Sequence, residues 1–162
     1  MRKEETRRAV DILGGHGEAI RFLDVEDGAL EKHVESASER IAEIIADVDP
    51  DEIYVTSEHE EHRDHVAACV VVRSALRKTH SHATLYRYIV SLRSGLLWSA
   101  IPEPSVSIDI ADQLETKRRA VSQFASHLKI VAKGQREPFF KNVDKWLQPK
   151  EVFFVDPSPC SR

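Results

Sequence analysis

The sequence has little of what would suit it to a disulfide-bonded, membrane-spanning or nucleic-acid-binding role. Only two of its 162 residues are cysteines, Cys69 and Cys160, and they form neither a CxxC pair nor a disulfide framework. Lys and Arg number 23 against 27 Asp and Glu, so the net charge of -4 gives no bulk attraction to nucleic acid or to an anionic membrane. The longest apolar run, residues 67–72, is far shorter than the roughly 18 residues of a membrane span. The first ten residues are highly charged and lack the apolar segment of a signal peptide. These absences favour a cytoplasmic protein with no membrane span and no nucleic-acid partner.

The composition is that of a folded domain. Hydrophobic residues make up 41% of the chain and charged residues 31%, which is enough apolar material for a core. The length suits one domain. We therefore expect a single domain over residues 1–156, followed by a flexible tail over 157–162.

Helix-like and strand-like segments alternate along the chain. Periodicity and turn residues predict helices over 2–13, 31–47, 66–76 and 111–129, and strands over 19–25, 53–56, 82–90, 106–110 and 152–155. Strands separated by helices indicate an α/β fold, and we expect a Rossmann-like layered α/β/α arrangement with a mostly parallel sheet.

A histidine-rich loop carries the most chemical information. Three of the eight histidines fall within residues 59–65, directly after the predicted strand 53–56. Ligands of open α/β sheets bind outside the carboxyl ends of the strands, so this position suits a site. His62 and His65 are three residues apart and can aim both rings into one pocket, and Asp64 can fix an imidazole tautomer. A solvated polar loop with incidental histidines fits the composition equally well.

The same loop resembles part of the PIG-L (LmbE-like) de-N-acetylase family. His62-Arg63-Asp64-His65, followed by an Ala-rich helix, is similar to the family's His-Pro-Asp-His segment, with Arg63 where proline is usual. Three further stretches agree in the family's order: Arg2 to Glu5 in a helix ending Leu13-Gly14, the Asp27-Gly28 turn, and a late helix from Lys117 to His127.

The resemblance implies a reaction and a role for five residues. The family's enzymes are typically zinc-dependent hydrolases of N-acetyl groups on glucosamine-like sugars, so an N-acetylated amino sugar is the implied substrate. The resemblance makes His65 a Zn²⁺ ligand, His62 the catalytic histidine that stabilises the oxyanion or acts as the acid, and Asp64 its orienting partner. Arg2 and Asp27 match positions that can contact the sugar.

The family's first metal-binding segment, of the type His-Pro-Asp-Asp-Glu, is absent from the sequence. We therefore expect an N-terminally truncated domain with an incomplete zinc site, inactive by itself. An unpaired sheet edge would favour pairing with a second copy, giving a homo-oligomer. Two alternatives stay open: a non-catalytic relative that binds a ligand or a partner chain, and a small metal-binding protein whose zinc is held by His59, His62 and His65.

Overall fold

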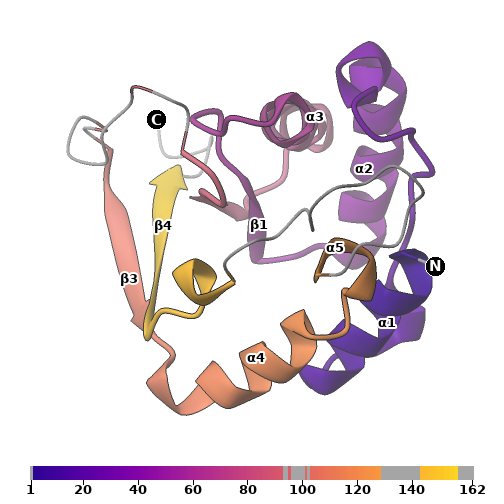
Figure 1. Cartoon of the computed structure of the whole chain (residues 1–162). Helices are drawn as coiled ribbons and strands as arrows, with labels where there is room; N and C mark the ends of the chain where they lie inside the picture. Colours follow the sequence, from indigo (N-terminus) through magenta and orange to yellow (C-terminus); the bar gives the residue numbers. More distant parts are fainter. Residues whose placement is uncertain (1, 93–94, 96–100, 102, 129–142, 157–162) are drawn as a thin grey trace. The chain divides into compact units, whose positions relative to one another are not determined.

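The computed structural model describes residues 2–92, 95, 101, 103–128 and 143–156 (Figure 1). It divides into two compact units. The helical unit comprises Met1–Phe22 and Ile108–Glu151, and the sheet unit comprises Leu23–Ser107 and Val152–Arg162. The single domain over 1–156 stays a prediction, and the predicted tail, 157–162, lies outside the described residues.

The helical unit is built on helix α1, Arg2–Ile12, which confirms the helix predicted over 2–13. This helix stops where Gly14 takes a left-handed backbone with φ of 87°, a conformation that favours glycine. Ala9 of α1 and Ala120 of helix α4, Leu114–Val121, are both buried where the two helices pack together. The described residues of this unit also form three short 3-10 turns: Gly17–Ala19, Ala111–Gln113 and Asp144–Trp146.

The prediction of one continuous helix over 111–129 is wrong. Helix α4 ends at Val121, and a separate turn of helix, α5, spans Ala125–Leu128. The break has a buried carboxylate beside it: Glu5 accepts hydrogen bonds from the backbone N–H of Ser126 at 3.0 Å and from its hydroxyl at 2.5 Å. These bonds lower the pKa of Glu5 and satisfy the N–H of a helix start that a continuous helix would not have.

The sheet unit holds most of a four-stranded sheet with the order β1-β2-β4-β3. The last two residues of β3 and the first two of β4 are assigned to the helical unit. The strands are β1, Glu52–Thr56; β2, Thr84–Tyr88; β3, Ser105–Asp109; and β4, Lys150–Asp156. Strand β1 pairs with β2 in parallel, with Val55 opposite Arg87, whereas β2 pairs with β4 antiparallel, with Arg87 opposite Phe154. An α/β fold is confirmed, but the prediction of a mostly parallel sheet is wrong, because the residue pattern of a strand does not encode its direction.

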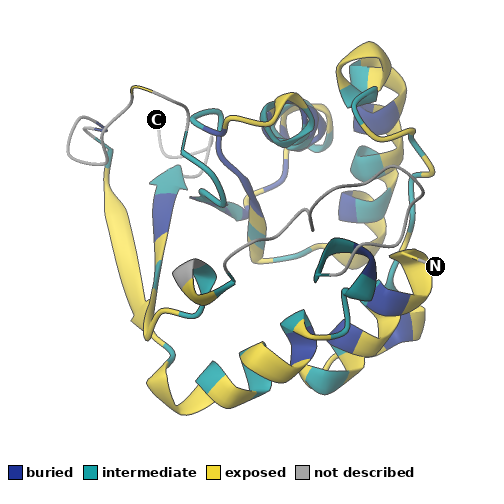
Figure 2. Cartoon of the chain, viewed as in Figure 1, coloured by how far each residue is buried: buried dark blue, intermediate teal, exposed yellow. Residues whose placement is uncertain are grey.

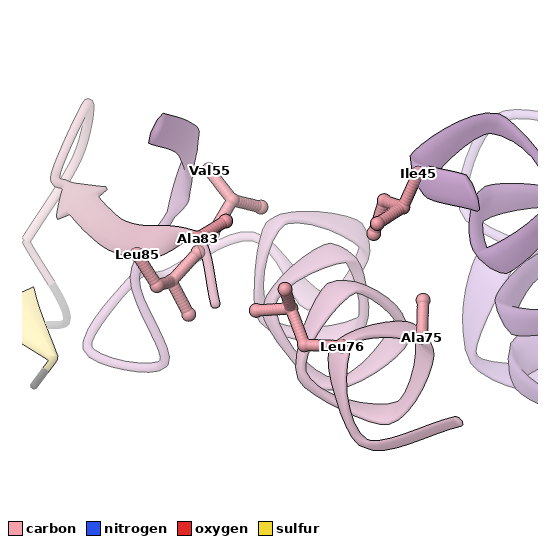
Figure 3. Packing of buried hydrophobic residues seen from close by; sticks show 6 residues of the cluster. All are labelled: Ile45, Val55, Ala75, Leu76, Ala83 and Leu85. Carbon is pink, nitrogen blue, oxygen red and sulfur yellow. The ribbon is translucent and has the colours of Figure 1, made fainter. Parts of the chain in front are cut away.

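Helices α2, Val34–Val48, and α3, Arg63–Thr79, pack on each other and on β1. Figure 3 shows the core that they share with β1 and β2, made of Ile45, Val55, Ala75, Leu76, Ala83 and Leu85. The predicted helix 31–47 is confirmed, with a 3-10 turn, Leu30–His33, in front of it. The predicted helix 66–76 starts three residues earlier, at Arg63, which brings the end of the histidine loop into its first turn. Figure 2 shows buried residues along the facing sides of α2 and α3.

The predicted strand over 19–25 is wrong. Residues 20–26 have no regular structure, and Asp24 lies in the left-handed region with φ of 56°, which interrupts an extended segment. The carbonyl of Leu23 instead accepts a hydrogen bond from the guanidinium of Arg40 at 2.7 Å. Among the described residues, no helix combines the length and the apolar character needed to cross a bilayer.

Candidate active site

The histidine loop connects the carboxyl end of β1 to the N-terminus of α3 in the sheet unit. Two hydrogen bonds hold its ends. The Ser57 N–H donates to the carbonyl of Tyr88 at 2.8 Å, which continues the β1–β2 ladder. The Thr56 hydroxyl donates to the carbonyl of His65 at 2.9 Å, which ties the first turn of α3 to the end of the strand. The loop is thus fixed on the edge of the sheet where α/β proteins bind their ligands.

The first half of the loop is anchored in a cluster of charges. The guanidinium of Arg87, which is only 2% exposed, contacts the carboxylates of Glu58, Glu103 and Asp156. Arg73 of α3 reaches Glu58 at 2.7 Å and Asp156 at 2.8 Å. Two arginines therefore bridge three carboxylates, and the five residues come from five separate segments of chain. We call these five residues the arginine–carboxylate cluster.

The cluster affects the pKa of its own Glu58 and of the neighbouring Cys69. Burial disfavours the charged form of Glu58, but a backbone N–H of the loop and the guanidinium groups of Arg73 and Arg87 together bring its pKa down to about 2. Burial, followed by the nearby Glu58 charge, raises the pKa of the Cys69 thiol to about 11. Cys69 is fully buried and stays protonated at neutral pH, so it does not supply a nucleophile.

His59 belongs to this anchored half. Its Nε2 lies 2.8 Å from Glu103 Oε1, and its ring meets Phe154 edge-on with 6.4 Å between centroids. The alternative of a zinc site made by His59, His62 and His65 therefore finds no support in the geometry. Among the described residues, no group of three His, Cys, Asp or Glu side chains could hold a metal ion.

The second half of the loop presents two imidazoles. The rings of His62 and His65 lie with their centroids 5.1 Å apart, tilted by 44°. His62 is the N-cap of α3: its Nδ1 accepts a hydrogen bond from the backbone N–H of Asp64 at 3.2 Å. A ring that accepts at Nδ1 carries its proton on Nε2, so exposed His62 offers an N–H donor beside His65.

Glu60 is the buried neighbour of His65. Its side chain has no exposed surface. Oε1 accepts from the N–H of Val90, and Oε2 accepts from the N–H of Ser91 at 3.1 Å. The same Oε2 lies 3.1 Å from His65 Nδ1, although the ring N–H is not well aimed along that line, so this buried Nδ1 has no well-directed hydrogen bond. Glu60, and less strongly the charges of Asp64 and Asp27, raise the pKa of His65, while burial acts in the opposite direction.

Asp64 has a different contact from the one predicted. Its carboxylate accepts hydrogen bonds from the backbone N–H groups of Gly28 at 2.6 Å and Leu30 at 3.2 Å, and its backbone N–H, rather than its carboxylate, meets His62. Gly28 has a positive φ of 81°, as an Asp-Gly turn requires. Asp64 thereby fastens the turn that carries Asp27 to the start of α3.

Four of the five predicted site residues are thus brought to one region: His62, Asp64 and His65 at the start of α3, and Asp27 in the turn fastened to it. Arg2 opens α1 in the helical unit, and its contact with a sugar stays a prediction. The roles of all five residues likewise stay predictions.

A pocket of about 370 Å³ opens beside the loop. Its lining combines aliphatic side chains with charged ones: Val34, Val66, Ala67 and Val70 with Glu31, Glu61 and Arg63. Residues 63, 66, 67 and 70 share one face of α3, and His65 lies on another face. The pocket is therefore next to His62 and Arg63 in the chain, but it is not the surface on which the imidazoles meet.

One protein family matches a part of the chain that includes this loop. Residues 1–76 match the family described as PIG-L: GlcNAc-PI de-N-acetylase. The resemblance to the PIG-L family is confirmed over these residues. The PIG-L match covers 76 of the 162 residues and includes every predicted site residue and the first part of α3. No curated protein matches the chain.

A solved structure shares the fold. The crystal structure of the zinc inhibited form of teicoplanin deacetylase Orf2 superposes with a TM-score of 0.62 at 18% identity. The similarity covers 99% of this chain and 75% of that one. At this identity the likeness supports the α/β fold alone and leaves substrate and activity open.

The sequence patterns did not single out the groups that hold the loop. Glu58 and Glu60 sit among polar residues that read as solvated, and Arg73 and Arg87 are distant in sequence from both. One signal was available: Arg87 is the fourth residue of a strand in which Leu85 is buried on the same side, so its side chain points into the core. A buried arginine needs carboxylate partners.

Proposed function

We propose that this chain acts as a hydrolase that removes an N-acetyl group from a glucosamine-like sugar or its conjugate. The observation that carries the proposal is the pair of imidazoles, His62 and His65, held 5.1 Å apart at the N-terminus of α3. The PIG-L match over residues 1–76 supports the same reaction class.

The two rings suit the needs of amide hydrolysis. Negative charge develops on the carbonyl oxygen as water adds, and a donor aimed at that oxygen lowers the barrier. His62 offers an Nε2–H for this purpose, because its Nδ1 is engaged in capping the helix. The leaving nitrogen needs a proton, and the attacking water must lose one. His65, whose own ring is half-exposed beside that of His62, is the second group in reach for proton transfer.

Zinc is the cofactor that the family resemblance implies, with His65 as a ligand. A catalytic zinc site has three protein ligands and an open position. The described residues do not fit that requirement, since none of their side chains joins His65 in a group of three. The protein would therefore need ligands from outside the described residues, and the steps above do not pass through the metal.

The incomplete ligand set favours a second candidate function. A chain with this loop and without a bound metal would bind an amino-sugar ligand or a partner without cleaving it. Asp27, the His62 ring and the adjacent pocket would then form a recognition surface only.

Acetate release from N-acetylglucosamine conjugates, measured with one equivalent of zinc and without it, tests the proposal on the full chain. We expect His62→Ala and His65→Ala each to lower kcat by about 10²–10³-fold. His59→Gln is the matched control, because a glutamine amide can still donate to Glu103 and keep the loop anchored, so the rate should be unchanged. Absence of acetate release from the folded protein, with binding of the same sugar detected by NMR, would establish the second candidate instead.

A further inference from the structure

Glu60 is a buried carboxylate whose position the chemistry above does not yet use. Its side chain has 0% exposed surface, and it comes from the loop rather than from a regular element. The N–H groups of Val90 and Ser91, just beyond β2, both donate to it. The backbone N–H groups of residues 90 and 91 and the imidazole of His65 make all four contacts of its two oxygens, without any ligand. A fully buried charge is costly unless each of its partners is in place.

The two oxygens of Glu60 have different partners. Oε1 faces the N–H groups of Val90 and Ser91, at 3.3 Å for Ser91. Oε2 is shared between the Ser91 N–H at 3.1 Å and His65 Nδ1 at 3.1 Å. The N–H groups of Val90 and Ser91 cannot turn away from Glu60, because the backbone just before them is fixed. There the Ser57 N–H donates to the carbonyl of Tyr88 and continues the β1–β2 ladder into the loop. Only the imidazole is free to adjust its ring to the carboxylate.

We propose that Glu60 is a positioning residue that holds His65 with its proton on Nδ1, so that the lone pair of Nε2 is available at the site. The proposal deepens the proposed function and rests on it for its catalytic meaning. His65 Nδ1 is buried without a well-directed partner, and Oε2 of Glu60 is the acceptor within reach. An N–H at Nδ1 needs only a small ring rotation to complete that bond, whereas an unprotonated Nδ1 would place a lone pair against a carboxylate.

His62 and His65 then carry their protons on opposite nitrogens. His62 accepts at Nδ1 and presents an N–H from Nε2. His65 donates from Nδ1 to Glu60 and presents a lone pair from Nε2. A donor and an acceptor on neighbouring rings form a complementary pair, suited to giving a proton on one side of a substrate and to taking a proton or binding a metal on the other.

Glu60→Gln separates this role from simple bracing of the loop. A glutamine has one carbonyl oxygen, and the N–H groups of Val90 and Ser91 require that oxygen on their side. The amide NH₂ would then face His65 and donate to Nδ1, which forces the ring proton onto Nε2. The variant therefore keeps the two backbone hydrogen bonds to Oε1, loses the one from Ser91 to Oε2, and inverts the His65 tautomer.

The test is the tautomer of His65, read from long-range ¹H–¹⁵N correlations of the folded full chain at a pH where the ring is neutral. His65→Gln assigns the resonance. We expect the Nδ1–H form in the natural chain and the Nε2–H form in Glu60→Gln, with kcat lowered about 10–100-fold at little-changed KM. Glu61→Gln is the matched control and should leave the His65 tautomer unchanged, since the Glu61 carboxylate faces Ser91 and the pocket rather than His65.

The outcomes distinguish the two proposals. An Nε2–H tautomer of His65 in the natural chain overturns the positioning role, and this measurement needs no variant to fold. A tautomer that is unchanged in folded Glu60→Gln also overturns it. The expected tautomers in a chain that releases no acetate from any conjugate would leave the positioning role standing and refute the proposed hydrolase.

Discussion

The two halves of the histidine loop differ in what their side chains do. The first half, Ser57 to His59, is built into the arginine–carboxylate cluster and the end of the β1–β2 ladder. The second half, Glu60 to His65, begins with a buried carboxylate and ends with two imidazoles at the start of a helix. Histidines that look equivalent in the sequence thus divide into one anchor and two presented groups. The contrast indicates that a site of this kind needs ion pairs that hold the loop in place before its reactive side chains can be presented.

Removing Arg87 from the arginine–carboxylate cluster should have the largest effect on stability. Arg87→Met leaves the carboxylates of Glu58, Glu103 and Asp156 close together and short of one positive charge. We expect a loss of about 3–5 kcal/mol in the free energy of unfolding, as for the removal of one partner from a buried ion pair. Urea unfolding at neutral pH measures the loss. Arg77→Met, at an exposed position of α3, is the control and should change stability by no more than about 0.5 kcal/mol. A loss below about 1 kcal/mol in Arg87→Met would mean that the loop does not depend on the cluster.

Acid should weaken the first half of the loop more gradually. The pKa of Glu58 is held down to about 2, from an ordinary value of 4.5. A lowered pKa stabilises the fold above the ordinary value, and that stability is lost as the pH falls from about 4.5 towards 2. We expect a loss on the order of 2 kcal/mol from this residue across the interval, allowing for its partial exposure. Urea unfolding at a series of pH values should show the slope, and Glu58→Gln should flatten it. Equal slopes in the two proteins would contradict the assignment.

The smallest effect concerns the helix start in the second half. Arg63 is the first residue of α3, where proline suits the helix, and His62 before it has the extended backbone, φ -79° and ψ 125°, that proline requires. Arg63→Pro should raise the free energy of unfolding by about 0.4–1 kcal/mol, because the unfolded chain loses freedom. Thermal unfolding measures the gain, and Arg63→Ala shows how much comes from removing the guanidinium alone. A destabilised Arg63→Pro would show that α3 does not start as described.

Much of the fold follows from local patterns. Helix α1 ends at its glycine, α2 ends before Asp49-Pro50, and β1 follows from a short β-branched run, because each depends on neighbours in the sequence. The direction of β4 and the break after Val121 depend on contacts between distant residues, which periodicity does not record. The strand predicted over 19–25 is wrong for a local reason, since the left-handed backbone of Asp24 interrupts the extended segment that the apolar pattern favours.

The site divides in the same way. The motif placed His62 and His65 together, and the structure brings their rings side by side. It did not reveal Glu60, because a glutamate in a run of polar residues gives no sign of being fully buried. The carboxylate of Asp64 was assigned to His62 by resemblance, yet it is engaged with the backbone of Gly28 and Leu30, a pairing across 36 residues that no local pattern contains.

That pairing has a consequence for how the site opens. The Gly28 amide proton is held by the carboxylate of Asp64, so its exchange with solvent requires the turn to detach from the start of α3. Hydrogen exchange at this one amide therefore reports the opening of a region that includes Asp27, His62 and His65 at once. A ligand that bridges the turn and the imidazoles would slow this exchange, while a ligand of the neighbouring pocket alone would leave it nearly unchanged.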